Sequence, residues 1–306
     1  MARIRCEGLT KCYGRVEALR GLSLCVEDGG CIGFLGPNGA GKTTTIRILT
    51  GLARPGGGRA EVNGFDVVTG RAKVKASIGY LAQSPAFYNY MSGEEFLLFT
   101  ASLFRLDGQA ARGRATELLT RLGLREARHR AIAGYSGGMR QRLGLAQALM
   151  NRPAILFLDE PVSSLDPIGR HEILSLIEEL KQETTVFMCS HVLADVERVC
   201  DRVIIVREGR VAVEAGIEQL RQSYATPVFT VELDSRDPDL TAALRAQPFV
   251  SGVRREGPVY RVAAADAGAA RRELPRFVLD AGATLVRYGV ETPTLEDIFL
   301  KVVGEP

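Results

Sequence analysis

The sequence lacks the features that would place the chain in a membrane or on nucleic acid. No run of about eighteen apolar residues occurs, so we expect that the chain does not span a membrane by itself. The net charge is only +3, so no strong basic field argues for a nucleic-acid partner. Residues Met1 to Cys6 contain no apolar stretch of the kind found in signal peptides. If the chain serves a membrane process, we expect another polypeptide to supply the membrane part.

Zinc and disulfide spacings are absent as well. The six cysteines form no C-x-x-C pair and no other zinc spacing. Cys31 and Cys189 lie in apolar runs, where a thiol serves as a small core residue. We therefore expect reduced cysteines, as in a cytosolic protein.

Length and composition favour two domains. A chain of 306 residues is long enough for about two, and a hydrophobic content of 46% allows a sizeable core. The composition changes near residues 221–227. We therefore predict a first domain over residues 1–222 and a smaller one over residues 223–306.

In the first domain, the apolar pattern predicts an α/β fold with three parts. Alternating residues before position 30 and a strand at 59–63 predict an antiparallel sheet. Helices between residues 92 and 150 predict a helical subdomain. The apolar run 155–158, followed by alternating helices and strands, predicts a parallel core sheet.

The second domain has the predicted order β-α-β-β-α-β, followed by a short helix, which is typical of a small split-βαβ fold. We therefore expect a small α+β domain. The expected strands cover 228–233, 249–254, 259–263 and 284–289, and the expected helices cover 238–246, 267–281 and 294–302.

The most specific motif is a glycine-rich segment, Gly36 to Thr43, with the pattern G-x-x-x-x-G-K-T of a phosphate-binding loop. An apolar strand precedes it and a helix follows. Backbone N–H groups of such a loop and the helix N-terminus bind phosphate. Lys42 can reach the β- and γ-phosphates, and the Thr43 hydroxyl can bind Mg²⁺. The candidate nucleotide-binding residues here are Gly36, Pro37, Asn38, Gly39, Ala40, Gly41, Lys42, Thr43 and Thr44.

A pair of carboxylates follows the apolar run that begins at Ile155. The strand fixes where they emerge, beside the phosphate loop at the carboxyl ends of the strands. Asp159 is placed to hold Mg²⁺, directly or through water, and Glu160 to activate the attacking water as general base. Alone, such a pair is weak evidence, but downstream of a phosphate loop it becomes strong.

The segment from Ser136 to Arg142, S-G-G-x-x-Q-R at the start of a helix, resembles the signature motif of ABC ATPases. The resemblance covers about residues 1–215, with the motifs in the family's order. Tyr135 and Met139 replace the commonest Leu and Gln, but backbone N–H groups and Ser136 would do the binding. The resemblance implies that Ser136, Gly137 and Gly138 bind phosphate at a second helix N-terminus.

The same resemblance implies roles for residues that would mean little alone. Tyr13 would stack on adenine, Gln83 would lie near Mg²⁺ and face the membrane partner, and His191 would touch the γ-phosphate. Residues 163–166, Ser-Ser-Leu-Asp, match the family's D-loop. His129 and His171 have no such context, and we interpret them as structural.

The family places each ATP between the phosphate-binding loop, called Walker A, of one subunit and Ser136 to Gly138 of a second subunit. ATP then joins the two subunits, and hydrolysis releases them. The resemblance therefore implies a Mg²⁺-dependent ATPase that acts as a head-to-tail dimer, most simply a homodimer.

The final segment P-T-L-E-D-I-F-L, residues 293–300, resembles the ending of exporter ATPases of the daunorubicin-resistance type. Leu295, Ile298, Phe299 and Val302 also form one apolar stripe, so the segment is expected to be a packing helix. We expect a peripheral subunit on the cytoplasmic face of the plasma membrane. It would energise efflux of a drug, antibiotic or lipid-like molecule through separate transmembrane permease subunits.

A soluble ABC ATPase is the alternative. Translation-type members carry two cassettes, whereas this chain has one. Repair-type members insert coiled coils between Walker A and the signature, but no heptads separate Lys42 from Ser136. An iron–sulfur assembly ATPase stays possible, although the C-terminal ending disfavours it. A P-loop kinase would leave the segment Ser136 to Gln141 unexplained.

Overall fold

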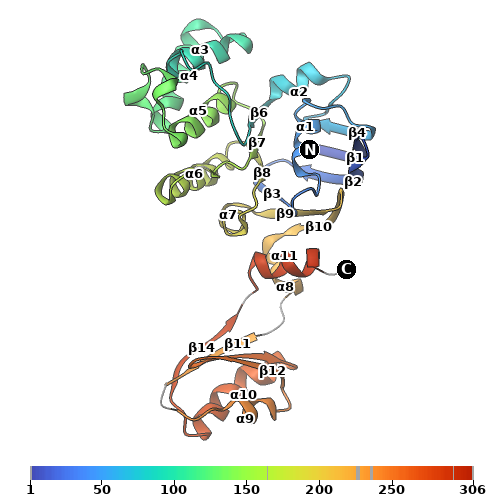
Figure 1. Cartoon of the computed structure of the whole chain (residues 1–306), viewed down its shortest axis with the longest axis vertical. Helices are drawn as coiled ribbons and strands as arrows, with labels where there is room; N and C mark the ends of the chain where they lie inside the picture. Colours follow the sequence, from blue (N-terminus) through green and yellow to red (C-terminus); the bar gives the residue numbers. More distant parts are fainter. Residues whose placement is uncertain (1, 164, 225–227, 235–236, 292, 305–306) are drawn as a thin grey trace. The chain divides into compact units, whose positions relative to one another are not determined.

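A computed structural model describes the chain except residues 1, 164, 225–227, 235–236, 292 and 305–306 (Figure 1). Its described residues divide into two compact units, one from residues 1–217 and 299–306, the other from residues 218–298. The predicted domain boundary after residue 222 stays a prediction.

The centre of the first unit is a six-stranded sheet in the order β10-β9-β3-β8-β7-β6. Its strands run parallel except β10, which pairs antiparallel with β9. Strands β3, β7 and β8 are buried at every position, so the prediction of a parallel core sheet is confirmed. The strands are β3 (Cys31–Leu35), β6 (Ile78–Leu81), β7 (Ile155–Asp159), β8 (Thr185–Cys189), β9 (Arg202–Arg207) and β10 (Arg210–Gly216).

A second, antiparallel sheet lies beside the first and shares a hydrophobic core with it (Figure 1). Its order is β2-β1-β4-β5 and its pairs are antiparallel, so the predicted antiparallel sheet is present. Its strands are β1 (Ala2–Tyr13), β2 (Val16–Glu27), β4 (Gly57–Val62) and β5 (Phe65–Asp66). Helix α1 (Lys42–Leu49) follows the phosphate loop, and the unpredicted helix α2 (Arg71–Ser77) precedes β6.

The predicted helical subdomain is present and extends from the β6 side of the parallel sheet (Figure 1). It contains α3 (Gly93–Leu103), α4 (Gly108–Arg121), two short 3₁₀ turns and α5 (Gly137–Leu149). Ser92 and Glu95 form a reciprocal capping box that starts α3. Helices α6 (Pro167–Leu180) and α7 (Leu193–Val199) complete the first unit, and α8 (Ile217–Tyr224) begins at the boundary with the second unit.

The second unit has the predicted β-α-β-β-α-β order, and its sheet runs β12-β13-β11-β14. Helices α9 and α10 lie on the same side of this sheet (Figure 1). The elements are β11 (Val228–Leu233), α9 (Thr241–Arg245), β12 (Val250–Glu256), β13 (Val259–Ala264), α10 (Ala267–Asp280) and β14 (Leu285–Glu291).

The helix predicted at 238–246 is too long. The Asp239 carboxylate accepts hydrogen bonds from the N–H and the hydroxyl of Thr241, at 2.8 and 2.6 Å, and this local turn delays the helix. The same bonds, with the nearby Arg255, lower the pKa of Asp239 to about 2. The predicted final helix is present as α11 (Leu295–Gly304), where Leu295 and Ile298 are fully buried.

Candidate functional site

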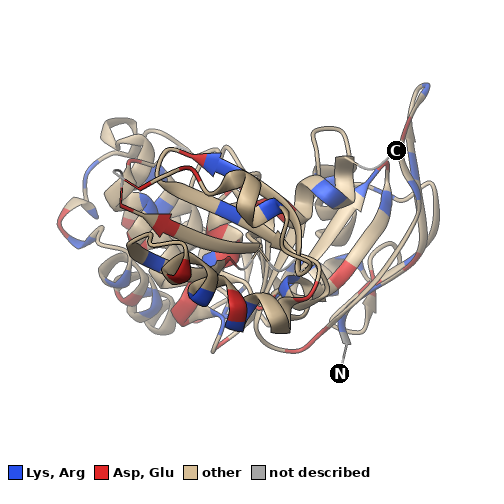
Figure 2. Cartoon of the chain, turned by 90° about the horizontal axis from the view of Figure 1, so that it is seen from below, with Lys and Arg blue, Asp and Glu red and all other residues tan. Residues whose placement is uncertain are grey.

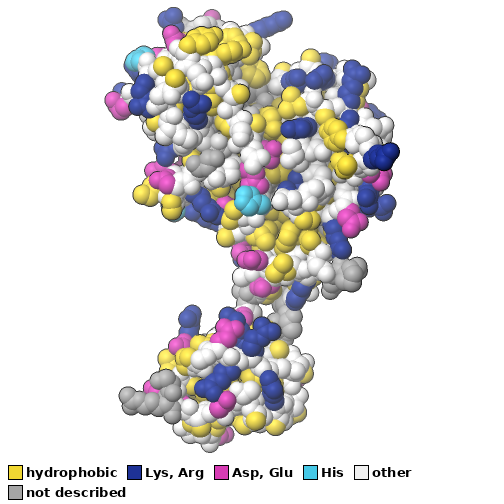
Figure 3. All heavy atoms as spheres, viewed as in Figure 1, with side chains coloured by type: hydrophobic (Ala, Val, Ile, Leu, Met, Phe, Trp, Pro, Cys, Tyr) yellow, Lys and Arg dark blue, Asp and Glu magenta, His cyan; other side chains and the backbone are white. Residues whose placement is uncertain are grey.

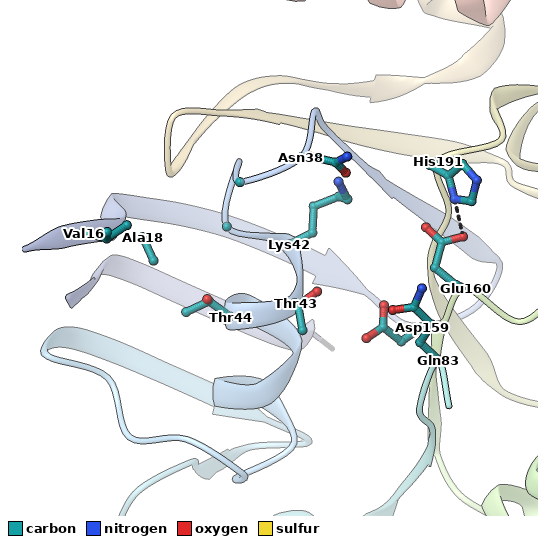
Figure 4. A pocket seen from close by; sticks show the side chains of 12 residues that line it. Val16, Ala18, Asn38, Lys42, Thr43, Thr44, Gln83, Asp159, Glu160 and His191 are labelled. Carbon is teal, nitrogen blue, oxygen red and sulfur yellow. Dashed lines mark hydrogen bonds and ion pairs between the residues drawn. The ribbon is translucent and has the colours of Figure 1, made fainter. Parts of the chain in front are cut away.

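A cavity of about 530 Å³ lies at the carboxyl ends of the parallel strands (Figure 4). One wall is the phosphate loop with the start of α1, and it contributes Asn38, Gly39, Gly41, Lys42, Thr43 and Thr44. The facing wall contributes Gln83, Asp159, Glu160 and His191 (Figure 4). Four separate segments that the sequence singled out therefore converge on one space.

The phosphate loop has the shape that an anion requires. Gly41 has φ 102°, and no side chain caps the N-terminus of α1, so the first N–H groups of the helix are free of side-chain partners. A Cβ atom at Gly41 would lie 2.7 Å from the carbonyl oxygen of Ala18, which makes glycine necessary there. Lys42 Nζ donates to the carbonyls of Gly36 and Pro37, at 2.5 and 3.1 Å. The Lys42 ammonium group, which carries the positive charge, is therefore held against the backbone of the loop.

Glu160 is held in an unusual backbone conformation. It follows the last residue of β7 with φ 53°, and its N–H donates to the carbonyl of Cys189 at 2.9 Å. Non-glycine residues with positive φ are costly and are often found at functional sites. The carboxylate is 2.8 Å from Nδ1 of His191, as the dashed line in Figure 4 marks. The backbone thus aims the Glu160 side chain into the cavity beside the histidine.

Asp159 has a buried carboxylate that lines the cavity together with other side chains that carry oxygen atoms. Burial and the charge of Glu160 raise the pKa of Asp159 above its ordinary value, while Arg47 and Lys42 oppose the shift. Thr43 and Gln83 line the same cavity. A hydroxyl, an amide oxygen and a carboxylate are hard oxygen ligands of the kind that suits Mg²⁺. The residues present therefore fit a magnesium ion.

Not all candidates from the first strands and the loop line this cavity. Tyr13, at the end of β1, is 47% exposed and has the Lys11 ammonium group 5.2 Å from its ring centre. Val16 and Ala18 line the cavity instead. Neither was predicted from the sequence as a site residue, and their only signal there is that they follow Tyr13 in the first hairpin. Ala40 of the phosphate loop is buried and does not line the cavity.

Ser136, Gly137 and Gly138 do not line the cavity that holds Lys42. They form the N-terminus of α5, where the Ser136 hydroxyl accepts a hydrogen bond from the N–H of Met139 at 3.2 Å. One chain thus presents two separate helix N-termini.

The unusual Tyr135 before this helix is accommodated by contacts of its own. Its buried ring lies 5.4 Å from the Arg130 guanidinium group, and its hydroxyl donates to the carbonyl of Ala127 at 2.8 Å. Buried Gln141 donates to the carbonyl of Pro161 at 2.9 Å, which ties α5 to the segment after Glu160.

The remaining sequence candidates have structural contacts. In the predicted D-loop, Asp166 caps α6 by accepting from the N–H of Gly169 at 2.9 Å, whereas Ser164 lies outside the described residues. His129 contacts Glu94, and His171 contacts Arg198, both at 3.0 Å. Neither histidine lines the cavity.

Charges of both signs alternate over the elements seen in Figure 2, with acidic and basic residues on neighbouring turns. In the part of the chain that the structure describes, no helix combines the length and the apolar character that crossing a membrane requires.

The chain resembles known proteins along nearly its whole length. Residues 19–163 match the family ABC transporter, and residues 216–303 match the family ATP-binding protein DrrA1-3-like, C-terminal domain. The uncharacterised ABC transporter ATP-binding protein YxlF of Bacillus subtilis (strain 168) is 41% identical over 297 residues, which cover 97% of this chain and 98% of that protein.

Two further comparisons agree. The daunorubicin resistance ATP-binding protein DrrA2 of Streptomyces coeruleorubidus is 36% identical over 98% of this chain and 95% of its own length. The dimeric structure of MJ0796, a bacterial ABC transporter cassette, superposes with a TM-score of 0.64 at 25% identity, over 70% of this chain and 98% of that one. The chain therefore belongs to the ATP-binding proteins of ABC transporters, a family of ATPases, and carries a DrrA-like C-terminal domain.

Proposed function

We propose that the chain hydrolyses ATP to ADP and phosphate to energise export through separate transmembrane subunits. The observation that carries the catalytic part is the single cavity that joins the phosphate loop to Asp159, Glu160 and His191. Phosphoryl transfer needs positioning and charge stabilisation more than covalent chemistry. The two walls of this cavity supply both.

Each wall has its own task in this proposal. Lys42 and the N–H groups of the loop hold the β- and γ-phosphates. Glu160 orients the attacking water and accepts its proton, and His191, 2.8 Å from Glu160, orients the carboxylate and contacts the γ-phosphate. Tyr13 stacks on the adenine. Thr43, Gln83 and Asp159 would hold Mg²⁺, which when bound supplies positive charge to the β- and γ-phosphates.

The raised pKa of Asp159 gives a pH prediction. Mg²⁺ needs the carboxylate form, so affinity for Mg·ATP should fall about tenfold per pH unit once the pH drops below this pKa. In Asp159→Asn, affinity should be weaker at neutral pH and this part of the pH dependence should disappear. Isothermal titration calorimetry of both proteins, at several pH values between about 5 and 8, measures the affinity for Mg·ATP. An unchanged pH profile would remove Asp159 from the metal site.

The same shift predicts an opposite effect on stability. Because the folded state binds the Asp159 proton more tightly than the unfolded state, deprotonation at neutral pH costs the nucleotide-free chain stability, and that cost vanishes as the pH falls through the raised pKa. Asp159→Asn should therefore melt at a higher temperature than the parent at neutral pH. Thermal melts without nucleotide provide this check.

The second helix N-terminus supports a dimer as the active form. Ser136 to Gly138 lie outside the cavity of their own chain, so they would complete the site of a second copy. The dimeric cassette among the similar structures supports this arrangement. Binding of ATP would close the dimer, and hydrolysis would open it.

Support for export comes from the resemblance to a daunorubicin resistance protein and from an exposed apolar patch. Hydrophobic side chains gather over α3 in Figure 3. Tyr88, Tyr90 and Leu103 are 48%, 77% and 67% exposed, and the Tyr88 ring contacts Phe99 of α3 at 5.6 Å. An apolar patch of this kind marks a site for another polypeptide.

The patch continues into a groove beside the catalytic site. Leu103 and Phe104 line a cavity of about 420 Å³ together with Tyr80 of β6. Two residues after β6 comes Gln83, which lines the nucleotide cavity. A cytoplasmic segment of a permease in this groove could therefore sense the nucleotide through Gln83. This arrangement would hold the subunit on the cytoplasmic face of the plasma membrane.

We expect Leu103→Glu to release the chain from the membrane fraction of its native host. The charge would face an apolar partner surface without a counter-ion. ATP hydrolysis by the isolated chain should stay within about twofold of the parent, because Leu103 is exposed and does not line the nucleotide cavity. Val68→Glu, at a 42% exposed valine outside the patch, is the matched control. If Leu103→Glu stays bound to membranes, this surface does not hold the permease; if the parent never sediments with membranes, a soluble ABC ATPase becomes the better proposal.

A further inference from the structure

The sheet of the second unit has two edge strands that differ in protection. Edge strands expose backbone groups that can pair with another chain, and proteins usually guard them with charges or caps. Strand β12 carries Arg254, Arg255 and Glu256 in succession, and Arg245 donates to the carbonyl of Val253 at 3.0 Å. Strand β14 also carries charges, Arg287 and Glu291, but among the described strands it pairs only with β11, and no side chain of a described residue donates to its backbone. The edge at β14 is therefore open.

Apolar side chains gather at this open edge. Among the described residues of the second unit, the large apolar side chains that are exposed are Leu279, Val286 and Val290, at 60%, 59% and 41%. Two belong to β14, and Leu279 lies in the last turn of α10, which packs on β14. Exposed apolar residues that cluster along an unpaired strand indicate an interface.

The sequence of β14 is complementary to itself in an antiparallel pair. A bulge at Val286 interrupts the strand, and the regular part is Arg287-Tyr288-Gly289-Val290-Glu291. If two copies pair about Gly289, Arg287 of each lies opposite Glu291 of the other, and Tyr288 lies opposite Val290. Opposite charges and aromatic–β-branched pairs both stabilise antiparallel strands.

Gly289 supports this centre. A Cβ atom there would meet no atom within 4 Å, and its φ is not positive, so the fold of one chain does not require glycine. Glycine within a strand often marks the close approach of another backbone. At the centre of the pair, the two Gly289 residues would face each other and leave room for the long Arg287 side chains.

We propose that β14 pairs with β14 of a second copy of this chain about Gly289, which joins two four-stranded sheets into one of eight strands. The second copy is the one that the proposed function requires, but this contact needs no nucleotide. It would keep the partner close while the ATP sites open after hydrolysis, because a tethered partner is present at an effective concentration on the order of 1 mM.

Sedimentation velocity of the full chain without nucleotide, at concentrations up to about 1 mM, tests the proposal. We expect reversible dimers, and Val290→Lys should weaken their association at least about tenfold because it places a cation in the apolar contact. Val68→Lys, at a valine of nearly equal exposure in the first unit, should leave association unchanged. A chain that stays monomeric, or variants that associate equally, would overturn the proposal.

A charge exchange tests the centre of pairing. Arg287→Glu and Glu291→Arg should each weaken the dimer, because like charges then face each other, and the double variant should restore it. This rescue also answers the concern that Glu291 contacts Arg261 and Thr230 within its own chain, at 3.1 and 2.7 Å. If both singles weaken the dimer and the double variant does not recover, the strands do not pair about Gly289.

A failure of the β14 contact can be distinguished from a failure of the proposed function. In a Glu160→Gln background, Val290→Lys should still form dimers with Mg·ATP, because that dimer is joined at the nucleotide sites. Loss of the ATP-dependent dimer with the nucleotide-free dimer intact would contradict the proposed function and leave this inference standing.

Discussion

Glu160→Gln should abolish ATP turnover while the chain continues to bind ATP. Glutamine keeps the size and the backbone of Glu160 but cannot accept the proton of the attacking water, and loss of a general base costs about 10²–10⁴-fold in rate. The phosphate loop and Lys42 are untouched, so affinity for Mg·ATP should change by less than about threefold. Phosphate release at saturating Mg·ATP and equilibrium binding of ATP measure the two quantities separately.

The same variant should accumulate as an ATP-bound dimer. If hydrolysis is what opens the dimer, a chain that binds but cannot hydrolyse ATP should shift from monomer to dimer when Mg·ATP is added, on a sizing column loaded below the concentration at which the nucleotide-free chain dimerises. Glu126→Gln, at an exposed glutamate outside the cavity, should behave like the parent. Parent-like turnover in Glu160→Gln would remove this residue from the role of base, and its strained backbone, at φ 53°, would then need another explanation.

The sequence predicted those parts of the site that contiguous residues determine. The phosphate loop, its strand and its helix form one local unit, so the motif implies the shape. Asp159 and Glu160 follow a strand that is buried at every position, and their location at the sheet edge follows from that. The order of elements in the second unit could be predicted because its strands alternate, as in β11 with Phe229, Val231 and Leu233 inward.

Features that arise from contacts distant in sequence could not be predicted. Val16 and Ala18 reach the cavity because the antiparallel sheet packs on the phosphate loop, and no local pattern records that packing. The raised pKa of Asp159 depends on burial by several elements. Helix α2 was missed because Val74 is its only buried residue, which leaves too little apolar periodicity. The open edge at β14 could not be predicted either, because it follows from the order of the strands in the sheet.

Ser136→Arg should bind ATP but fail to form the ATP-bound dimer, whereas Glu160→Gln should bind ATP and accumulate as that dimer. Because Ser136 lies outside the cavity of its own chain, the variant should bind ATP with nearly the affinity of the parent. The bulky guanidinium group at the start of α5 would occupy the space that the phosphate of a second copy needs, and it would remove the hydroxyl that accepts from Met139. Turnover should fall at least about 10²-fold, since each complete site needs both chains.

Sizing of the double variant Glu160→Gln/Ser136→Arg with Mg·ATP gives the decisive reading. We expect a monomer where Glu160→Gln alone gives a dimer. Ser223→Arg, at an exposed serine of α8, controls for the added charge, and thermal melts control for folding. Dimers that persist, with turnover retained in Ser136→Arg, would show that α5 does not complete a second site. Loss of ATP binding in a well-folded Ser136→Arg chain would place Ser136 in the site of its own chain, contrary to the geometry of the cavity.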